Sequence, residues 1–219
     1  MYLYALGIVP VIDASLINYL WPVIIVILTQ FLPDHKLKWH HIVGVILGFM
    51  GLVFLFYDSQ TIFKDIQWGH IVAFFAALVW SGYSVLTRVV KTYSQSSVPV
   101  SFLYAGIILL IISLIVEPFK IVEWQQYLFM VLLSAVSGVG YFLWSNAMKY
   151  GSIQIMGVCS YLTPLFSTLL LVTFDKTILS GNIALATLFI AAGPLIASRQ
   201  KMREAIAEHK ALRRMKNHE

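Results

Sequence analysis

Long apolar runs separated by short polar turns dominate this sequence and restrict the folds open to it. Seven runs have roughly the 17–25 residues that a helix needs to cross a bilayer. They span residues 13–32, 39–57, 68–90, 98–116, 124–148, 153–174 and 181–197. Their apolar residues are continuous rather than alternating, which favours helices over a transmembrane barrel. Because 59% of the 219 residues are hydrophobic and only 11% are charged, against about a quarter in soluble domains, we predict an all-α integral membrane protein.

Two of these runs carry a proline near mid-length in similar surroundings. The first contains Asn-Tyr-Leu-Trp-Pro at residues 18–22, and the second contains Ser-Tyr-Leu-Thr-Pro at residues 160–164. Proline lacks an N–H, so the carbonyl four residues before it loses its helical partner. Polar backbone at membrane depth is tolerated only against protein or a water-filled cavity. We therefore expect Pro22 and Pro164 to mark hinges that face inward.

A gapless repeat links the two proline runs. Tyr19 matches Tyr161 and Pro22 matches Pro164, each pair 142 residues apart. Identical residues also recur at this offset from Ala5, Leu20, Leu28, Leu37 and Gly51. The copies lie five runs apart, and an odd number of crossings makes them antiparallel. Inverted repeats with a site near the membrane midplane are typical of transporters.

The two copies are not equally complete. Three runs precede the second proline run, whereas only the short apolar segment 1–9 precedes the first. We therefore predict an inverted-repeat bundle of seven full transmembrane helices plus an N-terminal half-helix, cut from a five-plus-five design. Residues 1–60 would be the rest of the first repeat, 61–198 the second repeat and 199–219 a basic tail.

Positive charge gathers in the tail and on one set of short loops. The tail from Arg199 onward contains no Phe, Tyr or Trp, so it does not resemble a nucleic-acid-binding face. A basic segment beside anionic lipid explains it better. By the positive-inside rule the C-terminus is predicted to be cytoplasmic.

Five motifs together resemble the drug/metabolite transporter superfamily, in particular its EamA-domain members and, among these, the bacterial aromatic amino-acid exporters. The motifs are the two proline segments, Trp-His-His at 39–41, Leu-Val-Trp-Ser-Gly-Tyr-Ser at 78–84, and Tyr-Phe-Leu-Trp-Ser-Asn-Ala at 141–147. The likeness covers residues 2 to about 198. It implies a ten-helix bundle in the intact family, an inner-membrane location in bacteria, a small metabolite as substrate, and no cofactor.

A transporter needs weak contacts that hold a solute and then release it. Aromatic rings supply these through stacking and cation–π contacts of about 0.5–2 kcal/mol each. We expect the substrate-binding residues to be Asn18, Tyr19, Trp21, Trp80, Tyr83, Trp144 and Tyr161. The carbonyls of Asn18 and Ser160, freed by the prolines, are expected to accept from a substrate ammonium.

Charge is scarce within the runs. Asp13 stands at the end of a run, where snorkelling to the interface would explain it. His70 is expected to be an ordinary interfacial residue. No mid-membrane carboxylate is evident for a proton relay, which favours facilitated movement of a neutral or zwitterionic solute. The sequence indicates neither a set of converging metal ligands nor a catalytic motif, so we expect no metal site and no enzyme activity.

Three functions fit these patterns. The first is export of aromatic or other hydrophobic amino acids by alternating access through an aromatic-lined cavity. The second keeps the transporter but carries lipophilic cations or drugs. The third is a non-transporting, truncated membrane subunit. The oligomeric state is left open.

Overall fold

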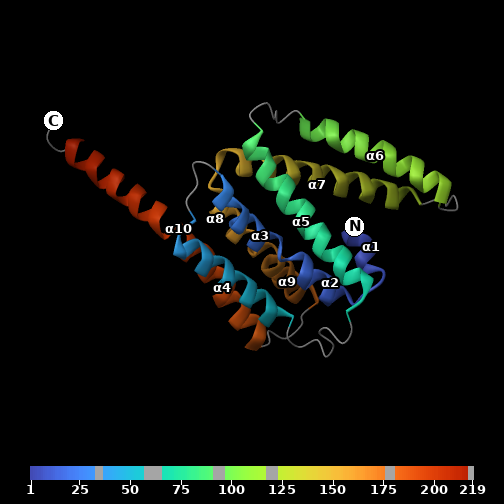
Figure 1. Cartoon of the computed structure of the whole chain (residues 1–219), viewed down its shortest axis with the longest axis horizontal. Helices are drawn as coiled ribbons and strands as arrows, with labels where there is room; N and C mark the ends of the chain where they lie inside the picture. Colours follow the sequence, from blue (N-terminus) through green and yellow to red (C-terminus); the bar gives the residue numbers. More distant parts are fainter. Residues whose placement is uncertain (33–36, 57–65, 91–96, 117–122, 176–180, 217–219) are drawn as a thin grey trace. The chain divides into compact units, whose positions relative to one another are not determined.

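The fold is helical in every part that the structure describes. The computed structural model describes residues 1–32, 37–56, 66–90, 97–116, 123–175 and 181–216, and these ranges contain no strand. The chain divides into two compact units (Figure 1). The first unit comprises residues 1–85 and 152–219, and the second comprises residues 86–151.

The helices follow the predicted runs closely. The first unit contains α1 Tyr2–Leu6, α2 Val11–Asn18, α3 Trp21–Leu28, η1 Thr29–Phe31, α4 Trp39–Leu55, most of α5 Trp68–Val89, α8 Ile153–Cys159, α9 Leu162–Asp175 and α10 Gly181–Lys216. The second unit contains α6 Ser97–Val116 and α7 Trp124–Tyr150. Among the described residues, 5 helical segments are long and apolar enough to cross a membrane, and two shorter apolar ones cover 39–55 and 153–167.

The two proline runs are each broken one turn before the proline. In the first run, the Leu20 N–H donates to the Ile17 carbonyl at 3.1 Å, which is a three-residue bond that tightens the helix end. In the second, the Tyr161 N–H donates to the Val158 carbonyl at 3.3 Å. Pro22 then stands in the first turn of α3, where the missing N–H removes no bond within α3 and prevents one back to the Asn18 carbonyl of α2. The prolines therefore divide each run instead of only bending it.

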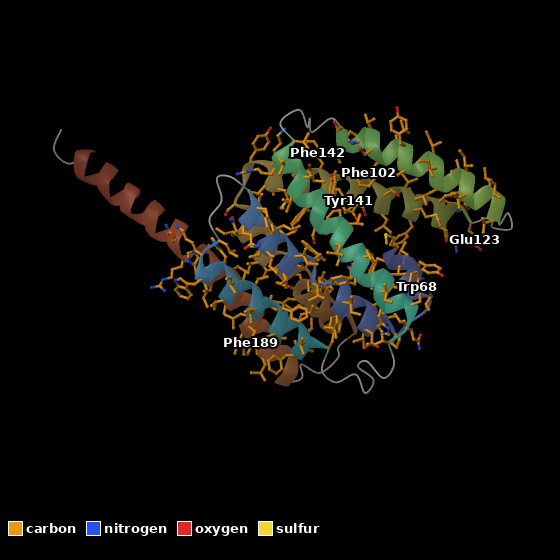
Figure 2. All side chains as sticks on the ribbon, in the orientation of Figure 1. Trp68, Phe102, Glu123, Tyr141, Phe142 and Phe189 are labelled. Atoms are coloured by element: carbon orange, nitrogen blue, oxygen red, sulfur yellow. The ribbon has the colours of Figure 1, made fainter. Side chains whose placement is uncertain are left out.

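Helices α4 and α10 lie side by side in the first unit (Figure 1). A Cβ on Gly44 would lie 2.7 Å from the Gly193 carbonyl oxygen, and a Cβ on Gly193 would lie 2.7 Å from that of Gly44. Only glycine permits such close backbone approach. Figure 2 shows Phe189 on α10, and its ring centroid lies 5.3 Å from that of Phe54 on α4.

Helix α10 continues well past its predicted apolar end at Ala197. It extends to Lys216. Residues 199–216 contain no glycine or proline and are rich in Ala, Lys, Arg, Glu and Met, which have high helix propensity. The described part of the basic tail is therefore a continuation of the last transmembrane helix.

The second unit consists of the end of α5 and the pair α6 and α7. An apolar groove of about 710 Å³ lies between α6 and α7, where Val98, Phe102, Leu133 and Phe142 contribute to its lining. The ring of Phe102 lies against that of Tyr141 on α7, with centroids 5.1 Å apart and ring planes tilted by 42° (Figure 2). The Arg88 guanidinium, at the end of α5, donates to the Lys149 carbonyl near the end of α7.

Candidate functional site

The two proline runs meet at their breaks. They run in opposite directions within the first unit (Figure 1), and α3 packs on α8. At Gly157 of α8, an added Cβ would lie 3.3 Å from Val26 Cγ2 and 3.4 Å from the Pro22 carbonyl oxygen. The Tyr161 hydroxyl donates to the Tyr19 carbonyl at 3.1 Å, and these two residues are 142 positions apart. The contact therefore joins equivalent positions of the repeat that the sequence predicted.

Tyr161 connects the repeats through packing as well as through its hydroxyl. Its side chain is fully buried, and its ring covers Gly48 of α4, where an added Cβ would overlap Tyr161 Cδ2. In this conformation the ring has no surface available to a solute. The structure places Tyr161 as a tie between the two broken helices, and its contact with substrate stays a prediction.

Three of the predicted residues form one group, which we call the aromatic cluster: Trp21, Trp80 and Tyr83. The ring centroids of Trp21 and Trp80 are 6.3 Å apart at 90°, and those of Trp80 and Tyr83 are 5.5 Å apart at 36°. All three side chains are half-buried, so each presents a partly accessible face. The cluster joins the first proline run to α5.

Ser81 fixes the cluster in place, and the sequence analysis missed it. Its hydroxyl lies 3.0 Å from the Trp21 carbonyl and 2.6 Å from the Ala77 carbonyl, and its side chain is fully buried. A serine beside a tryptophan in an apolar run could have indicated this role, because a buried hydroxyl requires a hydrogen-bond acceptor. Ser81 therefore positions the backbone of Trp21 against α5.

The remaining predicted residues lie around the breaks or in the other unit. Asn18 and Tyr19 are half-buried at the first break. Pro22 and Pro164 are buried. Trp144 is half-buried on α7 and belongs to the second unit.

The Ser160 carbonyl is not left without a partner by Pro164. It accepts from the Thr163 N–H at 3.1 Å, and its expected contact with a substrate ammonium stays a prediction. The reason is local: the break allows a three-residue turn, which supplies a donor in place of the one that Pro164 lacks.

The expectation that Asp13 snorkels to the interface is wrong, and the His70 side chain beside it is buried as well. Asp13 is only 2% exposed and His70 only 6%, and Asp13 Oδ2 lies 3.4 Å from His70 Nε2. Neither side chain extends to an interface as a snorkelling residue would. They face each other between α2 and α5, a pairing across 57 positions that no local sequence pattern signals.

Comparison with known proteins gives a consistent result. The model of the EamA-like transporter family matches residues 1–57 and 67–199. The aromatic amino acid exporter YddG of Ancylobacter novellus is 31% identical over 201 residues, which cover 90% of this chain and 70% of that protein. The Escherichia coli protein of the same name is 24% identical, over 84% of this chain and 66% of its own length. This chain therefore spans about two thirds of the length of these relatives.

A solved structure agrees with the sequence matches. A chain described only as the crystal structure of a protein superposes with a TM-score of 0.81 at 30% identity, over 91% of this chain and 70% of that one. The antiparallel proline runs, their contact at equivalent positions and these matches lead to one conclusion: the chain belongs to the EamA-like transporter family and is an all-α, multi-pass membrane protein.

Proposed function

We propose that this protein exports aromatic or other hydrophobic amino acids across the bacterial inner membrane by alternating access. The observation that carries the proposal is the aromatic cluster, in which Trp21 lies edge-on to Trp80 beside the first helix break. Two relatives that bear the name of aromatic amino acid exporters support the substrate class.

The cluster suits a solute that must bind and leave. Stacking on a ring contributes about 0.5–1.5 kcal/mol beyond burial of the ring's area. Two or three such contacts hold a flat side chain without trapping it. The half-buried Asn18 and Tyr19 lie at the break next to Trp21, and they provide polar groups for the solute's amino acid moiety. The substrate contact expected of Trp144, which lies in the second unit, stays a prediction.

The proline breaks provide the moving parts. Each divided run can change the angle between its halves without losing helical hydrogen bonds, because those bonds are already absent at the break. Opposed movement of two antiparallel broken helices around a central site is how inverted-repeat transporters alternate access. Pro22 and Pro164 are proposed as hinges of this movement.

A second cargo is compatible with the same rings. Tryptophan and tyrosine faces also attract organic cations, with contacts of about 0.5–2 kcal/mol. The experiment must therefore present an aromatic amino acid and a quaternary ammonium dye separately.

The test measures efflux of labelled tryptophan from preloaded cells that express the gene. Wild type is expected to lower intracellular tryptophan, and Trp21→Ala to slow efflux about 2–10-fold, equivalent to losing one ring contact. Phe75→Ala is the matched control, because Phe75 is an aromatic on α5 that is 50% exposed and lies outside the aromatic cluster. It should leave efflux unchanged.

Two outcomes would overturn the proposal. Efflux of the dye without efflux of tryptophan would assign the protein to cation export. Unchanged tryptophan and dye levels, with the protein shown to be in the membrane, would assign it to a non-transporting role.

A further inference from the structure

A buried acid–imidazole pair lies in the first unit, apart from the aromatic cluster. Asp13 stands in the first turn of α2 and His70 in the first turn of α5. Their side chains are 2% and 6% exposed. Val9, Ala14 and Val72, which are near them in sequence, belong to a small apolar core. Buried ionisable groups within a membrane segment are costly and point to a function.

The hydrogen bond from Gln67 selects one tautomer of the neutral imidazole. The Gln67 N–H donates to His70 Nδ1 at 2.9 Å, so Nδ1 carries a lone pair. The ring proton is then on Nε2, which faces Asp13 Oδ2 at 3.4 Å. In this tautomer Asp13 Oδ2 is the acceptor in the contact.

Asp13 lies near the N-terminal end of α2, whose dipole attracts negative charge. The Tyr2 phenol of α1 contacts the same helix two positions further on, where its oxygen lies 2.9 Å from Ser15 Oγ.

A route exists for one more proton. Gln67 and Trp68, which lead into α5, are exposed, so the Nδ1 edge of His70 lies close to the surface. The Gln67 carbonyl oxygen is 3.3 Å from Nδ1. When Nδ1 takes a proton from water, it loses the bond from the Gln67 N–H and can donate to that carbonyl instead. The product is an imidazolium facing a carboxylate.

We propose that Asp13 and His70 form a proton-binding site that sets the pH dependence of transport. Binding of one proton converts a neutral–anion hydrogen bond into an ion pair, which holds α2 to α5 more tightly. Helix α2 leads into the first break, and α5 carries Trp80 and Tyr83. A tighter hold between them slows the movement of the first proline run, so transport falls in acid. This inference rests on the proposed transport function.

The first test is tryptophan exchange by the purified protein in proteoliposomes, with equal pH inside and outside. Between pH 8 and 5.5, where histidine changes charge, the wild-type rate is expected to fall several-fold. His70→Gln keeps a donor toward Asp13 but cannot be protonated, so its rate should be independent of pH. Asp13→Asn keeps an acceptor but cannot form the ion pair, so its pH dependence should be weakened likewise.

The matched control is His41→Gln. His41 also occupies the third position of its helix, and its Nδ1 accepts from the Lys38 N–H at 3.3 Å. This variant should keep the wild-type pH profile. A flat wild-type profile, or a wild-type profile in His70→Gln, would overturn the proposal.

A second measurement does not depend on transport. The ion pair stabilises the folded chain only while the imidazole is protonated. The thermal midpoint of wild type should therefore rise relative to that of His70→Gln as pH falls from 8 to 5.5. A difference between the two thermal midpoints that stays constant with pH would overturn the proton-binding site. A difference that grows as pH falls, without any tryptophan exchange, would support the site and overturn the transport proposal alone.

Discussion

At the residue scale, the contact between Gly48 and Tyr161 shows how one absent side chain controls the packing of a membrane core. The Tyr161 ring is fully buried and its hydroxyl donates to the Tyr19 carbonyl at 3.1 Å. The ring is therefore held at both ends, by the core and by the hydrogen bond. Any atom added at Gly48 must displace it.

We expect Gly48→Ala to destabilise the protein by about 1–3 kcal/mol, which is the usual cost of overpacking a core. The new Cβ would lie 3.0 Å from Tyr161 Cγ and Cε2, and closer still to Cδ2. Thermal unfolding in detergent measures the effect.

Gly82→Ala is the paired control. A Cβ at Gly82 of α5 has no neighbour within 4 Å, and alanine raises helix propensity by up to about 1 kcal/mol relative to glycine. The two substitutions should shift the midpoint in opposite directions. Equal shifts would mean that the Tyr161 ring can move and does not fix the break.

At the element scale, each proline run is interrupted by a break and not only bent, as a proline usually bends a helix. Each proline run consists of two helices joined by a short turn, Val11–Asn18 with Trp21–Leu28, and Ile153–Cys159 with Leu162–Asp175. At the first break, the Tyr19 carbonyl is available to the second run and accepts from Tyr161. A continuous helix would have directed that carbonyl along its own axis.

We expect Pro22→Ala to leave the protein folded but to slow tryptophan efflux about tenfold. The restored N–H can bond the Asn18 carbonyl, which makes the run straighter and stiffer. Immunoblotting of membranes and the efflux assay together separate loss of protein from loss of movement.

Pro10→Ala is the control for this variant, because Pro10 precedes α2 and is exposed. It should transport normally. Normal efflux by Pro22→Ala would show that the break is not used as a hinge.

At the scale of the whole molecule, the distribution of positive charge predicts the orientation in the membrane. The described tail continues α10 to Lys216, so the orientation of this helix fixes the side on which the basic residues lie. Anionic lipid at the cytoplasmic surface attracts such a segment by about 1 kcal/mol per Lys or Arg near the surface.

We expect a fluorescent protein fused after Glu219 to be fluorescent, and a periplasm-dependent phosphatase fused there to be inactive. Fusions after Gln67, between α4 and α5, should give the opposite pair of results. Five predicted crossings separate Gln67 from the C-terminus, and an odd number of crossings reverses the side. An active phosphatase at the C-terminus would contradict the predicted orientation.

The all-helical class, the positions of the helices and the two breaks could be read from sequence. These features depend on local chemistry: apolar length for a helix that crosses lipid, and a missing N–H for a break. The repeat was also visible, because Tyr19 and Pro22 recur at the same spacing as Tyr161 and Pro164. The resemblance to the EamA-domain family was carried by the same segments.

The partners of individual side chains were decided only in three dimensions. Ser81 reaches the Trp21 carbonyl across 60 positions, and His70 reaches Asp13 across 57. A periodic pattern tells which face of a helix is apolar, but it does not tell which neighbouring helix covers that face or in what register. For this reason Asp13 and His70 looked like interfacial residues in the sequence, whereas helix packing has enclosed their side chains together, with Asp13 Oδ2 3.4 Å from His70 Nε2.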